Sequence, residues 1–146
     1  MTDLTEFFGG NGPLRELLPG FQPRAGQAWM AEAVAEAIQN SDKLVVEAGT
    51  GTGKTFAYLL PALLSGKKTI ISTGTKALQD QLYHRDLPLI SKVVGRPAET
   101  ALLKGRANYL CLQRVDQVTD VAASLVGDMN AVRAWRHRTD SGDRAE

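Results

Sequence analysis

The sequence of 146 residues lacks several features that define whole classes of protein. Its single cysteine, Cys111, excludes an intrachain disulfide framework and points to a reducing compartment. The formal net charge is only +1, so no global charge attracts nucleic acid or an anionic membrane. The first residues are acidic where a secretory signal is basic, and the longest apolar run, 58–64, is too short to cross a bilayer. We therefore expect a cytoplasmic protein with no membrane partner.

A glycine-rich stretch, 48–55, is the most informative feature that is present. It follows the apolar run 44–46, which we predict to be a strand, and it precedes a helical pattern. Successive glycines let backbone N–H groups face a ligand, and the helix directs its positive N-terminal end at the same place. The pattern predicts a phosphate-binding loop made by Ala48, Gly49, Thr50, Gly51, Thr52, Gly53, Lys54 and Thr55.

Two residues of this loop have expected chemical roles. Lys54 is expected to reach the β- and γ-phosphates of ATP, and the Thr55 hydroxyl is expected to bind Mg²⁺. The first position holds Ala48 where the strict pattern has glycine, and alanine is small enough for this position. An ordinary Gly/Thr-rich turn is the alternative, but the order of strand, loop, Lys-Thr and helix favours a nucleotide site.

Phe21, Arg24 and Gln27 lie one helix upstream of the loop. The amide of Gln27 donates and accepts at once, which suits the edge of adenine, where an amino group lies beside a ring nitrogen. The alternative is a solvated Gln and Arg at a helix start. With a phosphate loop downstream, we favour adenine recognition by Arg24 and Gln27.

Hydrophobic periodicity predicts the remaining elements. Residues 14–18 form a short helix, and residues 26–40 form a long one. The long helix has a buried face of Trp29, Met30, Ala33, Val34, Ala37 and Ile38. A helix over 55–64, a strand over 69–73 and a helix through Leu78 and Leu82 follow. We further predict irregular chain over 86–98, a strand over 100–103 and a polar helix from Asn108.

The alternation of strand and helix predicts an α/β fold with a parallel sheet, in which ligands bind at the carboxyl ends of the strands. That arrangement brings the segment after the second strand to the same edge as the phosphate loop. Its residues, Thr73, Gly74, Thr75 and Lys76, suit a phosphodiester backbone, because hydroxyls, backbone N–H groups and one ammonium bind phosphate without reading sequence. A simple helix cap by Thr75 is the equal alternative.

Four motifs in register resemble the N-terminal motifs of the DinG and YoaA helicases, bacterial relatives of the iron-sulfur helicase XPD. They are Phe21, Arg24 and Gln27, then 46–55, 72–82 and 103–112. The resemblance implies a superfamily 2 DNA helicase that moves 5′ to 3′ on single strands. It implies an incomplete P-loop NTPase (RecA-like) sheet followed by the start of a helical iron-sulfur domain. The implied parts are an N-terminal segment (1–25), the partial ATP-binding domain (26–106) and the start of the iron-sulfur domain (107–146).

The resemblance also assigns residues. It implies contact with adenine in the region of Gln27 and contact with single-stranded DNA along 73–81, which includes Gln79 and Gln81. It implies that Cys111 is the first of four cysteine ligands of a [4Fe-4S] cluster. On composition alone, Cys111 reads as a small buried hydrophobic residue.

The sequence contains no Asp-Glu-x-His box and no second cysteine. We therefore expect the front part of a larger helicase, which binds Mg-ATP but does not turn it over alone. The alternative is a free-standing phosphate-loop module or a small nucleotide kinase. A kinase needs an acceptor site and an arginine-rich lid after the phosphate loop. The residues that follow the loop in this sequence are better suited to contact the backbone of a nucleic acid.

Overall fold

The computed structural model describes residues 3–119 and 121–146, and the chain divides into two units between Ala101 and Leu102. Met1 and Thr2, at the start of the expected N-terminal segment, lie outside the described residues. None of the described helices is both long and apolar enough to cross a membrane.

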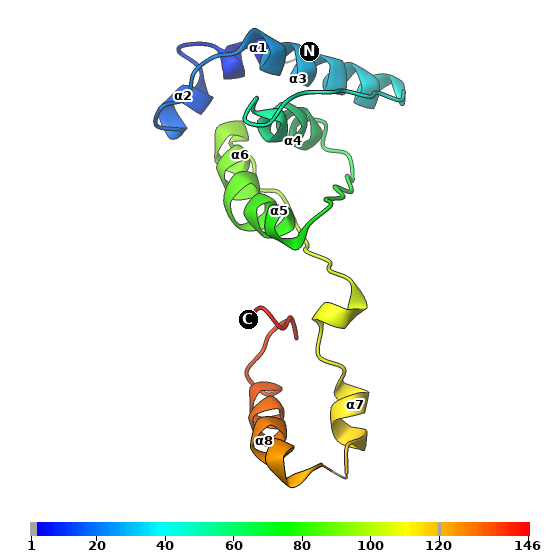
Figure 1. Cartoon of the computed structure of the whole chain (residues 1–146). Coiled ribbons are helices and arrows are strands. Elements are labelled where there is room, and N and C mark those ends of the chain that lie inside the picture. The colour runs from blue at the N-terminus through cyan, green and yellow to red at the C-terminus, as the bar shows by residue number, and fades with distance from the viewer. Residues whose placement is uncertain (1–2, 120) are drawn as a thin grey trace. The chain divides into compact units, whose positions relative to one another are not determined.

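Three helices open the first unit: α1 (Leu4–Phe8), α2 (Pro13–Leu17) and α3 (Ala25–Asn40) (Figure 1). The expected short helix and the first long helix are confirmed as α2 and α3. The sequence analysis missed α1, which begins where the Asp3 carboxylate accepts a hydrogen bond from the Thr5 N–H. Leu4 and Phe8 stand one turn apart and are both buried, so this segment is part of the core.

The helix predicted over 55–64 is confirmed as α4 (Lys54–Leu64), which lies at the centre of the core. Ala57, Leu59 and Leu60 are fully buried, and the helix packs against both α3 and α6. Pro61 lies inside the helix and is also buried. Because α4 is apolar on most sides, its first turn is fixed firmly within the unit.

A continuous helical segment replaces the first part of the irregular chain that we predicted over 86–98, and only 95–98 are irregular as predicted. Helix α5 (Lys76–Gln81) runs into the π-turn η1 (Leu82–Asp86), and α6 (Leu87–Val94) follows. The prediction was wrong because Pro88 was taken as a helix breaker. Pro88 directly follows the π-turn η1, in which the Leu87 N–H donates to the Leu82 carbonyl, and the irregular helix at this point accommodates a proline without ending.

The predicted strands are extended segments that form no β ladder in the described part of the chain. Residues 43–49, 67–73 and 98–105 are extended, but the described residues contain no β ladder, so the parallel sheet stays a prediction. Val45 is 96% exposed and Ile70 is 92% exposed. A parallel strand is normally covered on both faces, and these two have no such cover.

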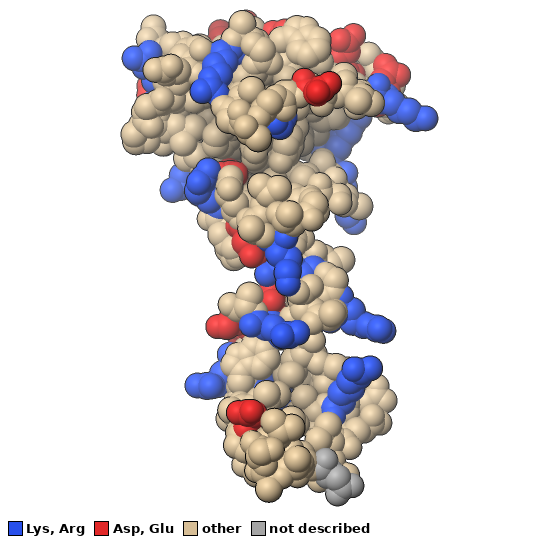
Figure 2. All heavy atoms as spheres, viewed as in Figure 1, with Lys and Arg blue, Asp and Glu red and all other residues tan. Residues whose placement is uncertain are grey.

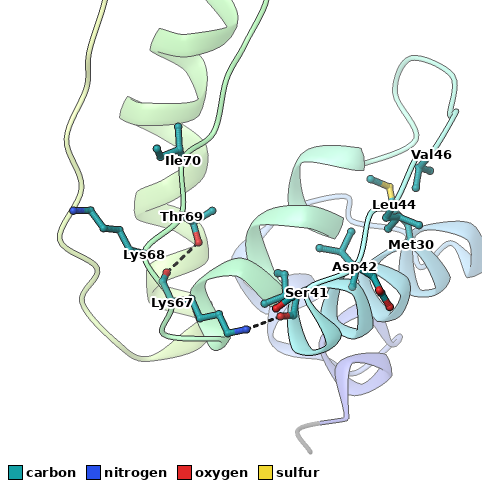
Figure 3. Close-up of a pocket in the computed structure, with 12 residues that line it drawn as sticks. Met30, Ser41, Asp42, Leu44, Val46, Lys67, Lys68, Thr69 and Ile70 are labelled. Atoms are coloured by element: carbon teal, nitrogen blue, oxygen red, sulfur yellow. Dashed lines mark hydrogen bonds between the residues drawn. The ribbon is translucent and has the colours of Figure 1, made fainter.

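A groove of about 690 Å³ lies between the segments around Val46 and Ile70, with α3 as its third side (Figure 3). Lys67 donates a hydrogen bond of 2.6 Å to the Ile38 carbonyl at the C-terminal end of α3. Met30 and Val34 line the groove and are only half-buried, and Trp29 is 61% exposed. The prediction that this face of α3 is buried is therefore wrong for Trp29, and it holds only in part for Met30 and Val34. The groove side of the helix is not covered by other described residues.

The second unit contains η2 (Arg106–Asn108), α7 (Leu112–Gln117), η3 (Ala123–Leu125) and α8 (Val126–Trp135) (Figure 1). The predicted helix from Asn108 is thus interrupted. Its apolar stripe is too thin to bury a long helix, and only Val115 is buried among the apolar residues of this unit that the structure describes.

The last residues return to the start of this unit and form a clasp, defined here as the contacts between 104–110 and 142–144. Lys104 and Asp143 form a buried ion pair of 2.6 Å, with side chains 4% and 12% exposed. The Leu110 N–H donates to the Gly142 carbonyl at 2.8 Å, and the Arg144 N–H donates to the Asn108 carbonyl at 2.9 Å. These contacts join residues that are far apart in sequence, so periodicity gave no sign of them.

The open groove predicts self-association. Unpaired extended segments with exposed apolar side chains pair readily with other chains, so we expect the 146-residue chain to form oligomers as its concentration rises. Ile70→Lys should reduce this association, because it places a charge on the exposed edge. Leu125→Lys, at a residue 52% exposed in η3 of the second unit and outside the extended segments, is the matched control. Sedimentation velocity measures the effect, and a monomer at all concentrations with a cooperative, reversible melt would contradict the prediction.

The clasp predicts a large effect of Asp143→Ala. Removing one partner of a buried ion pair costs about 3–5 kcal/mol, so exchange of the Leu110 and Arg144 amides should accelerate by roughly two to three and a half orders of magnitude. The double variant Lys104→Met/Asp143→Leu removes both charges and should exchange more slowly than Asp143→Ala. Amide exchange followed by NMR measures this, and unchanged exchange in Asp143→Ala would show that the pair does not hold the clasp.

Candidate functional site

The phosphate loop, 48–53, connects the extended segment before it to the first turn of α4. Gly51 and Gly53 have φ values of 74° and 85°, in the left-handed region that residues with a Cβ rarely adopt. The Thr52 hydroxyl donates to the Gly49 carbonyl at 2.9 Å across the turn. Two of the three glycines in the motif therefore stand at the two backbone conformations that favour glycine.

Lys54 folds back over this loop. Its Nζ donates hydrogen bonds of 2.5 Å to the carbonyls of Ala48 and of Gly49. The ammonium group is thus held at the loop by neutral acceptors, which a charged phosphate oxygen would outcompete because charge-assisted hydrogen bonds are stronger.

The first turn of α4 adds backbone donors. Gly53 is the N-cap and supplies no side chain, and the first intrahelical bond runs from Ala57 N–H to the Gly53 carbonyl at 3.3 Å. The N–H groups of Lys54, Thr55 and Phe56 precede that bond and have no acceptor within the helix. A helix start of this kind attracts anions.

Thr55 has a neighbour that the sequence analysis missed. Burial raises the pKa of the Tyr58 hydroxyl, the charge of Asp86 raises it further, and a hydrogen bond with the Thr55 side chain acts in the opposite direction. Tyr58 stands three residues after Thr55, so helical spacing was the available sign. Tyr58 is therefore a neighbour of the Thr55 hydroxyl on the same helix.

Arg24 and Gln27 contact the phosphate loop from the start of α3. Arg24 is exposed and donates through NH1 to the Gly51 carbonyl, and Gln27 is 5% exposed and donates through Nε2 to the Gly53 carbonyl at 2.9 Å. The structure thus brings the two predicted adenine-binding residues to the loop. Phe21, the third residue of that motif, packs against the hydrophobic core.

The segment predicted to contact DNA is organised around the start of α5. The Thr75 hydroxyl accepts from the Leu78 N–H at 3.2 Å, so Thr75 is the N-cap, and the Thr73 hydroxyl donates to the Thr75 carbonyl at 3.2 Å. Gly74 and Lys76 are exposed, and Gln79 is half-buried. In the described part of the chain, Thr73, Gly74 and Thr75 make no hydrogen bond to the phosphate loop.

The side chain of Gln81, at the end of this segment, bonds to a buried carboxylate. Its Nε2 donates to the Asp86 carboxylate at 3.1 Å, and Asp86, which is 1% exposed, also accepts from Arg85 Nε at 2.9 Å. Basic and acidic side chains are interspersed on the visible face of the first unit (Figure 2). On that face, affinity for DNA would have to come from local contacts.

Cys111 is exposed and is the N-cap of α7, so it is not the buried hydrophobic residue that composition suggested. Among the described residues, no group of three or more His, Cys, Asp or Glu side chains is placed to hold a metal ion. One thiolate does not satisfy a [4Fe-4S] cluster, so these residues do not by themselves fit that group.

A family model described as DEAD/DEAH box helicase matches residues 29–138. The ATP-dependent DNA helicase YoaA of Haemophilus influenzae is 56% identical over 149 residues, which cover 98% of this chain and 23% of the relative. YoaA of Escherichia coli is 52% identical over 144 residues, with 96% and 23% covered.

A more distant relative is the 3′-5′ exonuclease DinG of Bacillus subtilis, which is 39% identical over 145 residues, with 94% of this chain and 16% of the relative covered. The chain therefore spans less than a quarter of the length of these curated relatives. No solved structure matches it significantly.

Proposed function

The chain belongs to the DEAD/DEAH box helicase family, and we propose that it is the Mg-ATP-binding N-terminal part of a DNA helicase of the YoaA and DinG type. The family implies a P-loop NTPase fold. The observation that carries the proposal is the convergence of Lys54, Arg24 and Gln27 on a loop whose two left-handed residues are glycines.

The residues of the loop fit a triphosphate. Lys54 and the free N–H groups of the first turn of α4 would hold the phosphates, and the Thr55 hydroxyl would hold Mg²⁺. Arg24 and Gln27 would bind the adenine side. ATP, when bound, supplies the free energy of phosphoryl transfer to the whole enzyme.

Contact with single-stranded DNA is assigned to residues 73–81. Thr75 already caps α5, and a cap does not exclude phosphate binding, since the start of a helix also serves anions. Thr73, Gly74, Thr75, Lys76 and Gln79 are the proposed contacts. Gln81 is included from the family resemblance. Its hydrogen bond to the Asp86 carboxylate would have to break before its side chain could contact single-stranded DNA.

We extend the proposal to the domains of the longer protein. Residues 26–106 would belong to the RecA-like ATP-binding domain, after an N-terminal segment, and 107–146 would begin a helical iron-sulfur domain. Cys111 would be one of four cluster ligands, with the other three outside this chain. The whole enzyme would move 5′ to 3′ on single strands in the cytoplasm. The helicase relatives favour this reading over a nucleotide kinase.

Lys54→Ala tests the nucleotide site. The change removes the ammonium from the loop, and a lost charge-assisted hydrogen bond of about 1.5–3 kcal/mol weakens Mg-ATP binding roughly 10- to 100-fold. Lys92→Ala, at an exposed residue of α6, removes the same charge elsewhere and should bind as wild type does. Isothermal titration calorimetry measures both, and equal affinity of wild type and Lys54→Ala would refute the site.

The 146-residue chain should not turn over ATP. Phosphoryl transfer depends on several positioned groups, and the sequence has no Asp-Glu-x-His box to activate water. Phosphate release with and without single-stranded DNA should stay at background. Steady DNA-stimulated release from the purified chain would show that its own residues complete the catalytic site.

Cys111→Ser tests the cluster assignment in the full-length protein. If Cys111 is one of four ligands, anaerobically purified full-length Cys111→Ser should lose iron and the broad visible absorption of the cluster. The 146-residue chain should hold no stoichiometric cluster in either form. Wild-type iron content in the full-length variant would refute the assignment.

A further inference from the structure

We propose that Gln27 is a positioning residue for the phosphate loop, so that binding of the phosphates depends on its side-chain amide even when the ligand has no base. The inference rests on the proposed nucleotide site. It gives Gln27 a second role that base recognition does not require. The geometry around Gly53 points to this role.

The Gln27 amide is buried against the loop. Gln27 is 5% exposed in the first turn of α3, and α3 packs along α4. Its Nε2 donates to the Gly53 carbonyl at 2.9 Å, and that carbonyl also accepts the first intrahelical bond of α4, from Ala57, at 3.3 Å. A buried amide without a partner is unfavourable, so this contact is one the fold strongly retains.

The same amide lies where a side chain at Gly53 would be. A Cβ built at Gly53 would lie 2.2 Å from Gln27 Nε2 and 2.7 Å from its Cδ. The left-handed backbone of Gly53 and the close approach of Gln27 therefore occur together. Replacing Gln27 or Gly53 therefore changes the packing around the other residue, so the contact between them is part of the loop structure.

Holding a carbonyl also orients the next N–H group. In a trans peptide, the C=O of one residue and the N–H of the following residue point in opposite directions, and the described residues contain no cis peptide. Gln27 holds the Gly53 carbonyl toward α3, so the Lys54 N–H points away from α3. Arg24 holds the Gly51 carbonyl in the same way, which directs the Thr52 N–H away from α3.

Two side chains at the start of α3 thus fix the orientation of two peptide planes in the loop, those that follow Gly51 and Gly53. Each plane follows a residue with positive φ, where glycine has the most backbone freedom to lose. Fixing these planes before the ligand arrives lowers the ordering cost of binding. This lower ordering cost helps any ligand that has the phosphates, with or without a base. A contact between Gln27 and adenine would help only a ligand that has the base.

A ligand without a base separates the two roles. The probe is inorganic tripolyphosphate with Mg²⁺, compared with Mg-ATP in calorimetric titrations of the 146-residue chain. Gln27→Met keeps the length of the side chain and removes its donors. We expect its affinity for tripolyphosphate to fall about fivefold, as for loss of one neutral hydrogen bond. Gln39→Met, at an exposed residue near the end of α3, is the matched control and should bind as wild type does.

The outcomes are distinct. Wild-type affinity of Gln27→Met for tripolyphosphate, with weakened binding of ATP, would overturn the inference and leave Gln27 as a base-reading residue only. Failure of the wild-type chain to bind either ligand would instead overturn the proposed nucleotide site. Circular dichroism establishes that each variant is folded.

A measurement on the wild-type chain covers the case in which Gln27→Met does not fold. The side-chain NH₂ resonances of Gln27 should shift when Mg-tripolyphosphate is added, because the ligand polarises the peptide that Gln27 holds. Unshifted Gln27 resonances in a chain whose loop amides do respond would overturn the inference.

Discussion

The conformation of two peptides, those that follow Gly51 and Gly53, is the constraint on which the nucleotide site depends. Both glycines have positive φ, and both carbonyls are held from the start of α3. The position of α3 depends in turn on its packing against α4, whose buried residues Leu59 and Leu60 belong to the main core. A phosphate site formed by backbone groups is therefore maintained by the hydrophobic packing of two helices. Changes in that packing reach the loop through Gln27, because this side chain spans the distance between them.

The helices hold the loop without a completed sheet. The segments around Val45 and Ile70 are extended and exposed, while the loop between Ala48 and Lys54 has its hydrogen bonds in place. The proposed nucleotide site and the proposed DNA contacts consequently lie in different parts of the first unit. The conformation of the phosphate loop depends on α3 and α4. In the proposed fold, the position of Thr73 and Thr75 relative to the phosphate loop would depend on how the extended segments pair in a sheet.

The sequence predicts those parts that depend on local patterns. The loop, α3 and α4 were predictable, because glycine spacing and helical periodicity are encoded within a few residues. The π-turn and α6 were missed because Pro88 suggests a break, whereas the irregular helix after η1 accommodates it. Trp29 was assigned to a buried face because periodicity does not say which partner covers that face. The contacts of Gln27 with Gly53 and of Lys104 with Asp143 join residues 26 and 39 positions apart, beyond the reach of any local pattern.

Hydrogen–deuterium exchange of the chain with and without Mg-ATP tests the central claim most directly, that a loop held by α3 and α4 binds the phosphates. The account predicts slower exchange of the amides in 49–56 when Mg-ATP is present, since the ligand would accept from N–H groups that have no acceptor within α4. It predicts unchanged exchange in α8 (Val126–Trp135), which belongs to the other unit. Unchanged exchange over 49–56 under saturating Mg-ATP would contradict the account.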